Sequence, residues 1–312
     1  MICREPRNNV ACVNQADRIE QLPLILGSRG RLGRALCELI ENEHTDDLPD
    51  AVFATRDELD VTDTFRLSSE FERIRPTVVV NCAAFARVDD CETYPDLAEA
   101  INHAGARTVA RAARSVGARV IQISSDLVFD GVQPGPRRPY REEDPPRPLS
   151  QYARTKLAGE RAVAEENPDH TIIRSSWYFG PWPADRFPEV FLRALQEGRL
   201  LRMVADRIGS PTYLTDLSRA IVNIIHTPYR GILHFANRGD PVSRYRVVEA
   251  LAGRLGIDTS HLIPIPAAQW NEDLAERPAY SPLDPSRYER ITGRRSRTWE
   301  ECLEEYVRGR RR

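Results

Sequence analysis

No long apolar run occurs in this sequence, which excludes a membrane-spanning helix. None of its stretches approaches the roughly 20 apolar residues that a span requires, and residues 1–20 lack the apolar core of a signal peptide. An excess of charge is also missing, since 44 lysines and arginines face 46 aspartates and glutamates at a net charge of −2. We therefore expect a cytoplasmic protein that binds neither nucleic acid nor a membrane.

Cysteine is scarce, and its spacing fits no known framework. The sequence has six cysteines and no C-x-x-C pair; they are Cys3, Cys12, Cys37, Cys82, Cys91 and Cys302. Structural zinc sites and disulfide scaffolds both need closely spaced cysteines. The pattern favours a reducing compartment, and we place no metal ligands in the chain.

Short apolar runs alternate with helical patterns in the first half of the chain. The runs predict strands at 22–26, 51–55, 77–81, 118–123 and 170–173. Helices are expected between them at 31–43, 65–73, 96–116 and 151–166. This alternation is typical of an α/β protein with a Rossmann-like, doubly wound parallel sheet.

The pattern changes after about residue 175, where a loop rich in proline and aromatic residues begins. Helices are expected beyond it at 189–196 and 214–225, followed by shorter segments that prolines separate. We divide the chain into a polar N-terminal extension (1–20), an NAD(P)-binding Rossmann domain (21–175) and a smaller, mainly substrate-binding α/β domain (176–312). The helix at 214–225 is the segment that could return to the first domain.

A glycine-rich turn directly follows the first expected strand. Residues 27–33 read G-S-R-G-R-L-G and open the next expected helix. Glycines allow a tight turn and a close approach of the backbone to a pyrophosphate, and the N-terminus of a helix attracts an anion. In this context the spacing predicts a dinucleotide-binding turn. Its cofactor-binding members are Gly27, Arg29, Gly30, Arg31, Leu32 and Gly33.

The end of the second expected strand bears on which dinucleotide is bound. An acid there would hold the ribose 2′-hydroxyl of NADH, but the segment ends in Thr55-Arg56. Arg56, with Arg29, suits a 2′-phosphate instead, so we predict NADPH, with NADH as the alternative. A solvated arginine is the other interpretation of Arg56. Asp60 and Val61 follow and are expected to approach the adenine.

Ser125, Tyr152 and Lys156 form the candidate catalytic set. Ser125 ends the fourth expected strand, while Tyr152 and Lys156 lie four residues apart on the next expected helix and share one face. The lysine cation is expected to lower the tyrosine pKa from about 10 toward working pH. The serine could then hydrogen-bond a substrate carbonyl while the tyrosine delivers a proton. Beside a bound nucleotide, this set predicts hydride transfer.

Several motifs, in the same order, resemble those of the extended short-chain dehydrogenase/reductases, from about residue 22 to residue 305. Besides the glycine turn they are V-N-C-A-A-F-A-R-V-D (80–89), I-S-S-D-L-V-F-D-G (123–131), P-Y-R-E-E-D (139–144), Y-A-R-T-K-L-A-G-E (152–160), R-S-S-W-Y-F-G-P (174–181), D-R-I-G-S-P-T (206–212) and R-P (277–278). The ordered set is far more specific than any single motif.

The resemblance implies a function and several site residues. Ser125, Tyr152 and Lys156 would be the catalytic triad of an enzyme that reduces the C4 ketone of a nucleotide-linked 4-keto-6-deoxysugar with NADPH. The expected sugar is dTDP-4-dehydro-L-rhamnose and the product dTDP-L-rhamnose. The cofactor would also meet Ala84, Phe85, Ala86 and Ile123, and the sugar nucleotide would meet Asp126, Trp177 and Arg277.

The sequence also leaves alternatives open. Trp177 could be a core aromatic residue, and Arg277 could form a surface salt bridge. The family often has threonine at Ala86, glycine at Ala153 and glutamine at Arg207, and these differences bear on the identity of the sugar more than on the chemistry.

Other functions of related proteins are alternatives to this reductase activity, and the motifs bear on each of them. A sugar-nucleotide 4,6-dehydratase would need an acid where Leu127 stands. Another 4-ketoreductase, a 4-epimerase, or a non-catalytic subunit resembling the methionine adenosyltransferase beta subunit are the remaining alternatives. No feature decides whether the chain forms a homodimer.

Overall fold

A six-stranded parallel sheet is the centre of the computed structural model, which describes residues 22–42, 51–180 and 187–310. The strand order is β10-β5-β4-β3-β1-β2. The strands are β1 (Pro23–Leu26), β2 (Val52–Ala54), β3 (Val78–Asn81), β4 (Arg119–Ser125), β5 (His170–Ser175) and β10 (Gly231–His234). The predicted extension over 1–20 lies outside the described residues.

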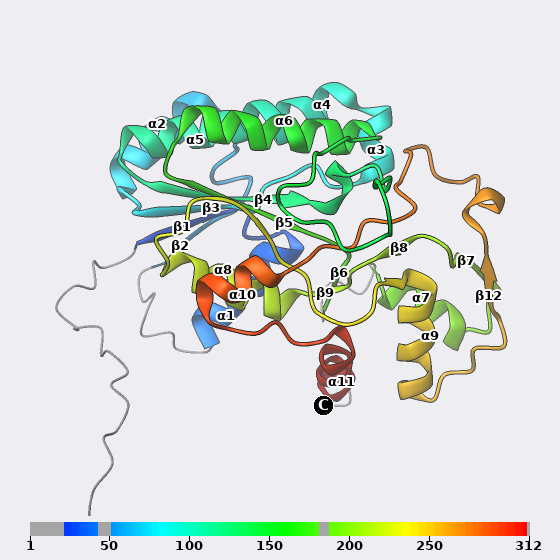
Figure 1. Cartoon of the computed structure of the whole chain (residues 1–312). Helices are drawn as coiled ribbons and strands as arrows, with labels where there is room; N and C mark the ends of the chain where they lie inside the picture. Colours follow the sequence, from blue (N-terminus) through cyan, green and yellow to red (C-terminus); the bar gives the residue numbers. More distant parts are fainter. Residues whose placement is uncertain (1–21, 43–50, 181–186, 311–312) are drawn as a thin grey trace, which may run out of the picture.

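Helices cover both faces of this sheet (Figure 1). One face carries α2 (Thr64–Ile74), α4 (Pro95–Glu99), α5 (Ala106–Ser115) and α6 (Gln151–Glu166), and the other carries α1 (Arg31–Asn42), α8 (Leu214–Ile225) and α10 (Ser286–Thr292). The strands are accordingly near-continuous apolar runs; all four residues of β1 and of β3 are buried. The predicted fold class is confirmed.

Five predicted strands correspond to β1–β5, and three predicted helices coincide with α6, α7 (Glu189–Gln196) and α8. The helix predicted at 96–116 is confirmed in its extent, but it is not a single α-helix. From α4 the chain passes into a π-helical segment, Ala100–Gly105, and then into α5. Helix α6 packs closely against this segment, since a Cβ atom at Gly159 would collide with the carbonyl oxygen of Asn102. A short helix, α3 (Val88–Thr93), precedes α4 and was not predicted.

The edge strand β10 was also missed. It pairs in parallel with β5, while α8 packs against α1 within one apolar cluster. More of the second half than the helix at 214–225 therefore contacts the first half of the chain.

The second half adds a smaller α/β unit beside the carboxyl edge of the sheet (Figure 1). Its short strands pair as β6 (Tyr178–Phe179) with β9 (Thr212–Tyr213), β7 (Leu201–Val204) with β12 (Leu262–Ile265), and β8 (Ile208–Gly209) with β11 (Val242–Ser243). An apolar cluster joins α7, α9 (Arg244–Leu255) and α11 (Trp299–Arg310).

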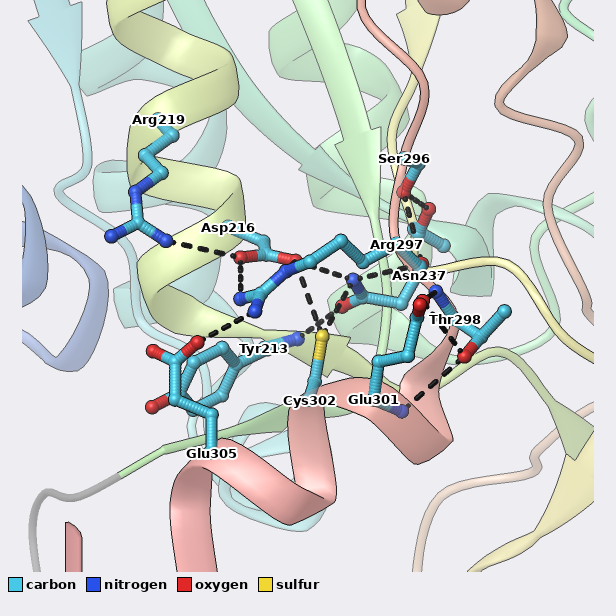
Figure 2. A network of polar contacts seen from close by, with 11 residues as sticks. Tyr213, Asp216, Arg219, Asn237, Ser296, Arg297, Thr298, Glu301, Cys302 and Glu305 are labelled. Carbon is cyan, nitrogen blue, oxygen red and sulfur yellow. Dashed lines mark hydrogen bonds and ion pairs between the residues drawn. The ribbon is translucent and has the colours of Figure 1, made fainter. Parts of the chain in front are cut away.

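A polar network attaches α11 to α8 (Figure 2). Asp216 of α8 accepts hydrogen bonds from Asn237 (2.8 Å) and from the Arg297 guanidinium, and Cys302 of α11 donates to it at 3.2 Å. Asn237 in turn accepts from the backbone N–H of Tyr213 at 2.6 Å. Because Tyr213 belongs to β9, which pairs with β6, the network also supports the segment that follows Trp177.

Candidate active site

A cavity of about 800 Å³ lies where the carboxyl ends of β3, β4 and β5 meet the smaller unit. In a parallel sheet this edge is where ligands bind, because strand ends and helix N-termini converge there. Its walls come from the glycine turn, from the strand ends, from α6 and from several segments of the second half, among them residues 176–178, 202–207 and 270–281.

The glycine turn is shaped for close backbone contact. Gly27 has φ +72°, and a Cβ atom there would lie 2.9 Å from the backbone nitrogen of Ala83. A Cβ atom at Gly33 would lie 2.7 Å from Ser28 Cα. Gly30 lines the cavity, whereas Gly27 and Gly33 do not. The turn therefore fits a dinucleotide pyrophosphate at the N-terminus of α1.

Two further members of the turn line the cavity, Arg31 and Leu32. The guanidinium of Arg31 donates to the backbone carbonyls of Tyr178 (3.0 Å) and Phe187 (3.1 Å). Arg31 thus connects the predicted cofactor turn to the wall that the second half supplies.

The residues predicted for the adenine end lie away from this cavity. Arg29 pairs with Asp57 at 2.9 Å and Arg56 with Asp60 at 3.0 Å, and both arginine side chains are 69% exposed. Val61 is buried against Gly105 of the π-helical segment. The two arginines remain accessible to a 2′-phosphate at the surface.

The predicted nicotinamide wall does line the cavity, through Ala84, Phe85, Ala86 and Ile123. Asn102, from the π-helical segment, holds Phe85 in place. Its side chain accepts from the Phe85 N–H at 2.9 Å and donates to the Phe85 carbonyl at 3.1 Å. The unpredicted π-helical segment therefore positions a residue of the predicted cofactor wall, and such segments often occur near functional sites.

Ser125, Tyr152 and Lys156 line the same cavity. Helix α6 begins at the right place because Ser150 caps it, accepting from the N–H of Ala153 at 3.2 Å. Tyr152 and Lys156 therefore lie on the first two turns of α6 and face the end of β4. The structure brings the three predicted catalytic residues together.

A chain of hydrogen bonds runs through these groups. Ser125 lies close enough to Tyr152 to act on its pKa, and the Ser125 hydroxyl donates to Asp126 at 3.1 Å. The Ser281 hydroxyl donates to the other carboxylate oxygen of Asp126 at 2.6 Å. Burial raises the pKa of Asp126 to about 6, although both serine hydroxyls act to lower it. Sequence reasoning missed Ser281, which carries no motif.

The expectation of a lowered tyrosine pKa is wrong for the protein without a ligand. Burial raises the pKa of Tyr152, a hydrogen bond with Ser125 offsets part of the rise, and Asp126 adds to it. The Lys156 ammonium instead donates to the Ile123 carbonyl at 2.7 Å. Tyr152 is therefore a protonated phenol at neutral pH, the form that donates a proton.

Lys156 is itself strongly affected by burial. Its pKa is lowered to about 8 by desolvation, while Glu160 and Cys82 act in the opposite direction. Below that pH the side chain is a cation facing the cavity, and above it a neutral amine.

Trp177 lies in the cavity wall and not in the core. Its φ is +41°, a left-handed conformation that is strained for a bulky residue. Gly209 makes room for its ring, since a Cβ atom there would lie 2.6 Å from the ring atoms. The guanidinium of Arg244 stacks on Trp177 at 5.1 Å and on Phe187 at 5.5 Å. Arg244, which also lines the cavity, was not predicted.

Arg277 lines the cavity too, but two carboxylates already hold it. It pairs with Asp89 at 2.6 Å and with Asp273 at 2.9 Å. Asp89 also accepts from the backbone N–H groups of Leu274 and Ala275, both at 3.0 Å. Arg277 and Asp89 thus fix the wall segment, and the salt-bridge interpretation describes the protein without a ligand.

The described part of the chain has neither a metal-ligand cluster nor a membrane-spanning helix. Among residues 22–42, 51–180 and 187–310, no group of three or more His, Cys, Asp or Glu side chains could hold a metal ion. Within the same described ranges, no helix is long and apolar enough to cross a membrane.

Comparison with known proteins identifies close similarities along nearly the whole chain. The model of the family described as "RmlD substrate binding domain" matches residues 22–311. A dTDP-4-dehydrorhamnose reductase from Mycobacterium tuberculosis (strain ATCC 25618 / H37Rv) is 37% identical over 86% of this chain and 86% of that protein. The spore coat polysaccharide biosynthesis protein SpsK from Bacillus subtilis (strain 168) is 35% identical over 92% of this chain and 97% of that protein.

The fold agrees with solved structures as well. The crystal structure of a dTDP-4-dehydrorhamnose reductase from Bacillus anthracis str. Ames in complex with NADP superposes with a TM-score of 0.85 at 32% identity. It covers 93% of this chain and 99% of that one.

The environment of Lys156 generates a prediction about pH. Affinity for NADPH, the expected cofactor, should fall as the pH rises through about 8, because the amine then loses the charge that attracts the anionic cofactor. Fluorescence titration with NADPH from about pH 7 to about pH 10 would measure it. Lys156→Met should bind more weakly and lose this pH dependence. The same decline in the methionine variant would assign it to another group.

Proposed function

This chain belongs to the RmlD substrate binding domain family, and on that premise we propose that it reduces the C4 ketone of a dTDP-linked 4-keto-6-deoxysugar with NADPH. The observation that carries the proposal is the convergence of Ser125, Tyr152 and Lys156 in one cavity with the glycine turn. The substrate we propose is dTDP-4-dehydro-L-rhamnose and the product dTDP-L-rhamnose, since relatives bearing that reductase name cover most of the chain.

The cofactor would lie along the edge of the sheet. The glycine turn would hold its pyrophosphate, Ala84, Phe85 and Ala86 would flank the nicotinamide, and Lys156 would hold the adjoining ribose. When bound, reduced nicotinamide supplies the hydride that reduces C4.

The protein's own groups manage the oxygen of the ketone. Ser125 can donate a hydrogen bond to the carbonyl, which polarises it. Tyr152 keeps its proton at neutral pH because burial raises its pKa, and it gives that proton to the oxygen as negative charge develops there. The Lys156 cation then stabilises the tyrosinate that remains.

The sugar nucleotide would occupy the side of the cavity that the second half forms. Asp126 has a pKa of about 6, so at neutral pH it is an acceptor for a sugar hydroxyl. Trp177 offers a ring face. Arg244 stands between Trp177 and Phe187, and within the described part of the chain it makes ring contacts but no ion pair. Its charge therefore suits the diphosphate better than that of Arg277.

Other functions of this fold fit the cavity less well. Leu127 lines it at the position where dehydration would require an acid. A non-catalytic subunit would have no need for a serine, a tyrosine and a lysine that converge beside the glycine turn.

The reaction can be tested at its proton donor. NADPH oxidation should be observed with a dTDP-4-keto-6-deoxysugar, and Tyr152→Phe should lower kcat by about 10²–10⁴ while the Kd for NADPH stays near that of the parent. Phenylalanine removes only the hydroxyl that carries the proton. Tyr94→Phe, at a 58% exposed tyrosine outside the cavity, is the matched control. Parent-like turnover by Tyr152→Phe would require another proton donor.

The choice of cofactor can be tested at the two surface arginines. Arg56→Gln and Arg29→Gln should each weaken NADPH binding by about tenfold, because a charge-assisted contact to the 2′-phosphate is lost. NADH binding should not change. Arg73→Gln breaks a similar exposed pair, with Glu70, and serves as the control. Equal losses for both cofactors would exclude the proposed role in selectivity.

The diphosphate site gives a comparison of two arginines. Arg244→Gln should raise the KM for the sugar nucleotide by at least about tenfold, and Arg277→Ala should raise it less, because Arg277 is held by Asp89 and Asp273. Cofactor affinity should be retained in both variants. A larger effect at Arg277, measured in steady-state kinetics, would restore it as the principal diphosphate partner.

A further inference from the structure

A buried carboxylate, Glu160, lies one helical turn beyond Lys156 on α6. Its side chain makes three polar contacts in the interior. One oxygen accepts from the Ser124 hydroxyl (2.5 Å) and from Arg174 Nε (2.9 Å), and the other accepts from Arg174 Nη2 (2.6 Å). Glu160 is 2% exposed and Arg174 1% exposed.

These contacts connect three elements just beneath the cavity. Ser124 of β4 lies opposite Arg174 of β5, and Ser125 lies opposite Ser175. Glu160 therefore attaches α6 to both strands at the residue that precedes the catalytic serine. Lys156 makes a second attachment one residue earlier, through the Ile123 carbonyl. The helix that carries Tyr152 and Lys156 is thus fixed to the strand that carries Ser125.

The negative charge of Glu160 also acts on Lys156. Glu160 and Lys156 are four residues apart on one face of α6, and Glu160 opposes the effect of burial on the pKa of Lys156. Arg174 of β5 neutralises part of that carboxylate. The other titratable group that acts on Lys156 is Cys82 after β3, and Tyr152 lies one turn earlier on α6.

Fold stability is a weak explanation for such a pair. Two charges lose their hydration on burial, and a buried ion pair is often no better for stability than well-packed apolar residues. A position beside the catalytic lysine gives the pair a function.

Resting on the proposed function, we propose that Glu160 is a positioning residue for the reaction: it aligns α6 with the end of β4 and acts as the buried counter-ion of Lys156, with Arg174 setting how much of its charge Lys156 experiences. Because Glu160 and Arg174 carry opposite charges, removing one or the other should shift the pKa of Lys156 in opposite directions. A purely structural role would not produce this pattern.

The test compares both partners of one ion pair. Glu160→Gln removes a negative charge near Lys156, and Arg174→Gln removes a positive one. The midpoint of the pH-dependent loss of NADPH affinity should move down by about one pH unit in the first variant and up by a similar amount in the second. Glu160→Asp, which retains the charge, should keep the parent midpoint.

A matched control lies on the same helix. Glu166 is near the C-terminal end of α6 and pairs with Arg111 at 2.7 Å on the surface. Glu166→Gln makes the same chemical change away from the cavity, where solvent screens it, and should leave the midpoint in place.

Shifts in the same direction for Glu160→Gln and Arg174→Gln, or no shift in either, would reduce the pair to a structural contact and overturn the proposal. Circular dichroism establishes which variants fold. If Glu160→Gln does not fold, Glu160→Asp and Arg174→Gln decide the question. The proposal is supported if Glu160→Asp keeps the parent midpoint and Arg174→Gln moves it upward. Any other pair of results overturns the proposal.

NADPH binding requires no sugar, so the measurement is independent of turnover. Opposite shifts in a protein that oxidises no NADPH with any dTDP-4-keto-6-deoxysugar would support the role of Glu160 toward Lys156 and reject the proposed function. Turnover of such a sugar without the opposite shifts would support the proposed function and reject the role of Glu160 toward Lys156.

Discussion

The parallel pairing of β4 with β5 is the constraint on which the candidate site depends. Its register places Ser124 opposite Arg174 and Ser125 opposite Ser175, so that the candidate catalytic serine directly follows a residue that is hydrogen-bonded to the buried Glu160. Helix α6 then attaches to that edge through Lys156 and Glu160. A shift of the register by one residue would turn Ser125 to the other face of the sheet and separate it from Tyr152.

Burial determines the chemistry that this edge can perform. The same loss of solvent that keeps Tyr152 protonated also brings the pKa of Lys156 down to about 8. The site therefore holds a proton donor and a cation side by side at neutral pH, which is the combination that a ketone reduction requires. Sequence spacing predicts that a lysine will lie next to a tyrosine, but burial depends on the surrounding fold, and for this reason the expected direction of the tyrosine shift was wrong.

Local motifs predicted most of the fold and the residues that meet at the centre of the cavity. A glycine turn between a strand and a helix, a serine at a strand end and a tyrosine four residues before a lysine are all set by nearby sequence. Contacts between distant segments were missed. The edge strand β10 is only four residues long, and two of them are partly exposed, so it lacks a strong apolar signal. Arg244 and Ser281 reach the cavity only through the packing of the second half.

One wall of the cavity is built from residues close together in the sequence and the other from distant segments, and this difference bears on substrate specificity. The proposed chemistry at the ketone resides on β4 and α6, whereas the opposite wall depends on contacts such as those of Asp89 with Leu274, Ala275 and Arg277, residues more than 180 positions away. The network around Asp216 anchors the same half through α11 (Figure 2). Replacements in that wall can therefore change which sugar nucleotide is held while Ser125, Tyr152 and Lys156 remain in place. A change to dehydration would, under the same proposal, need an acid at the position of Leu127.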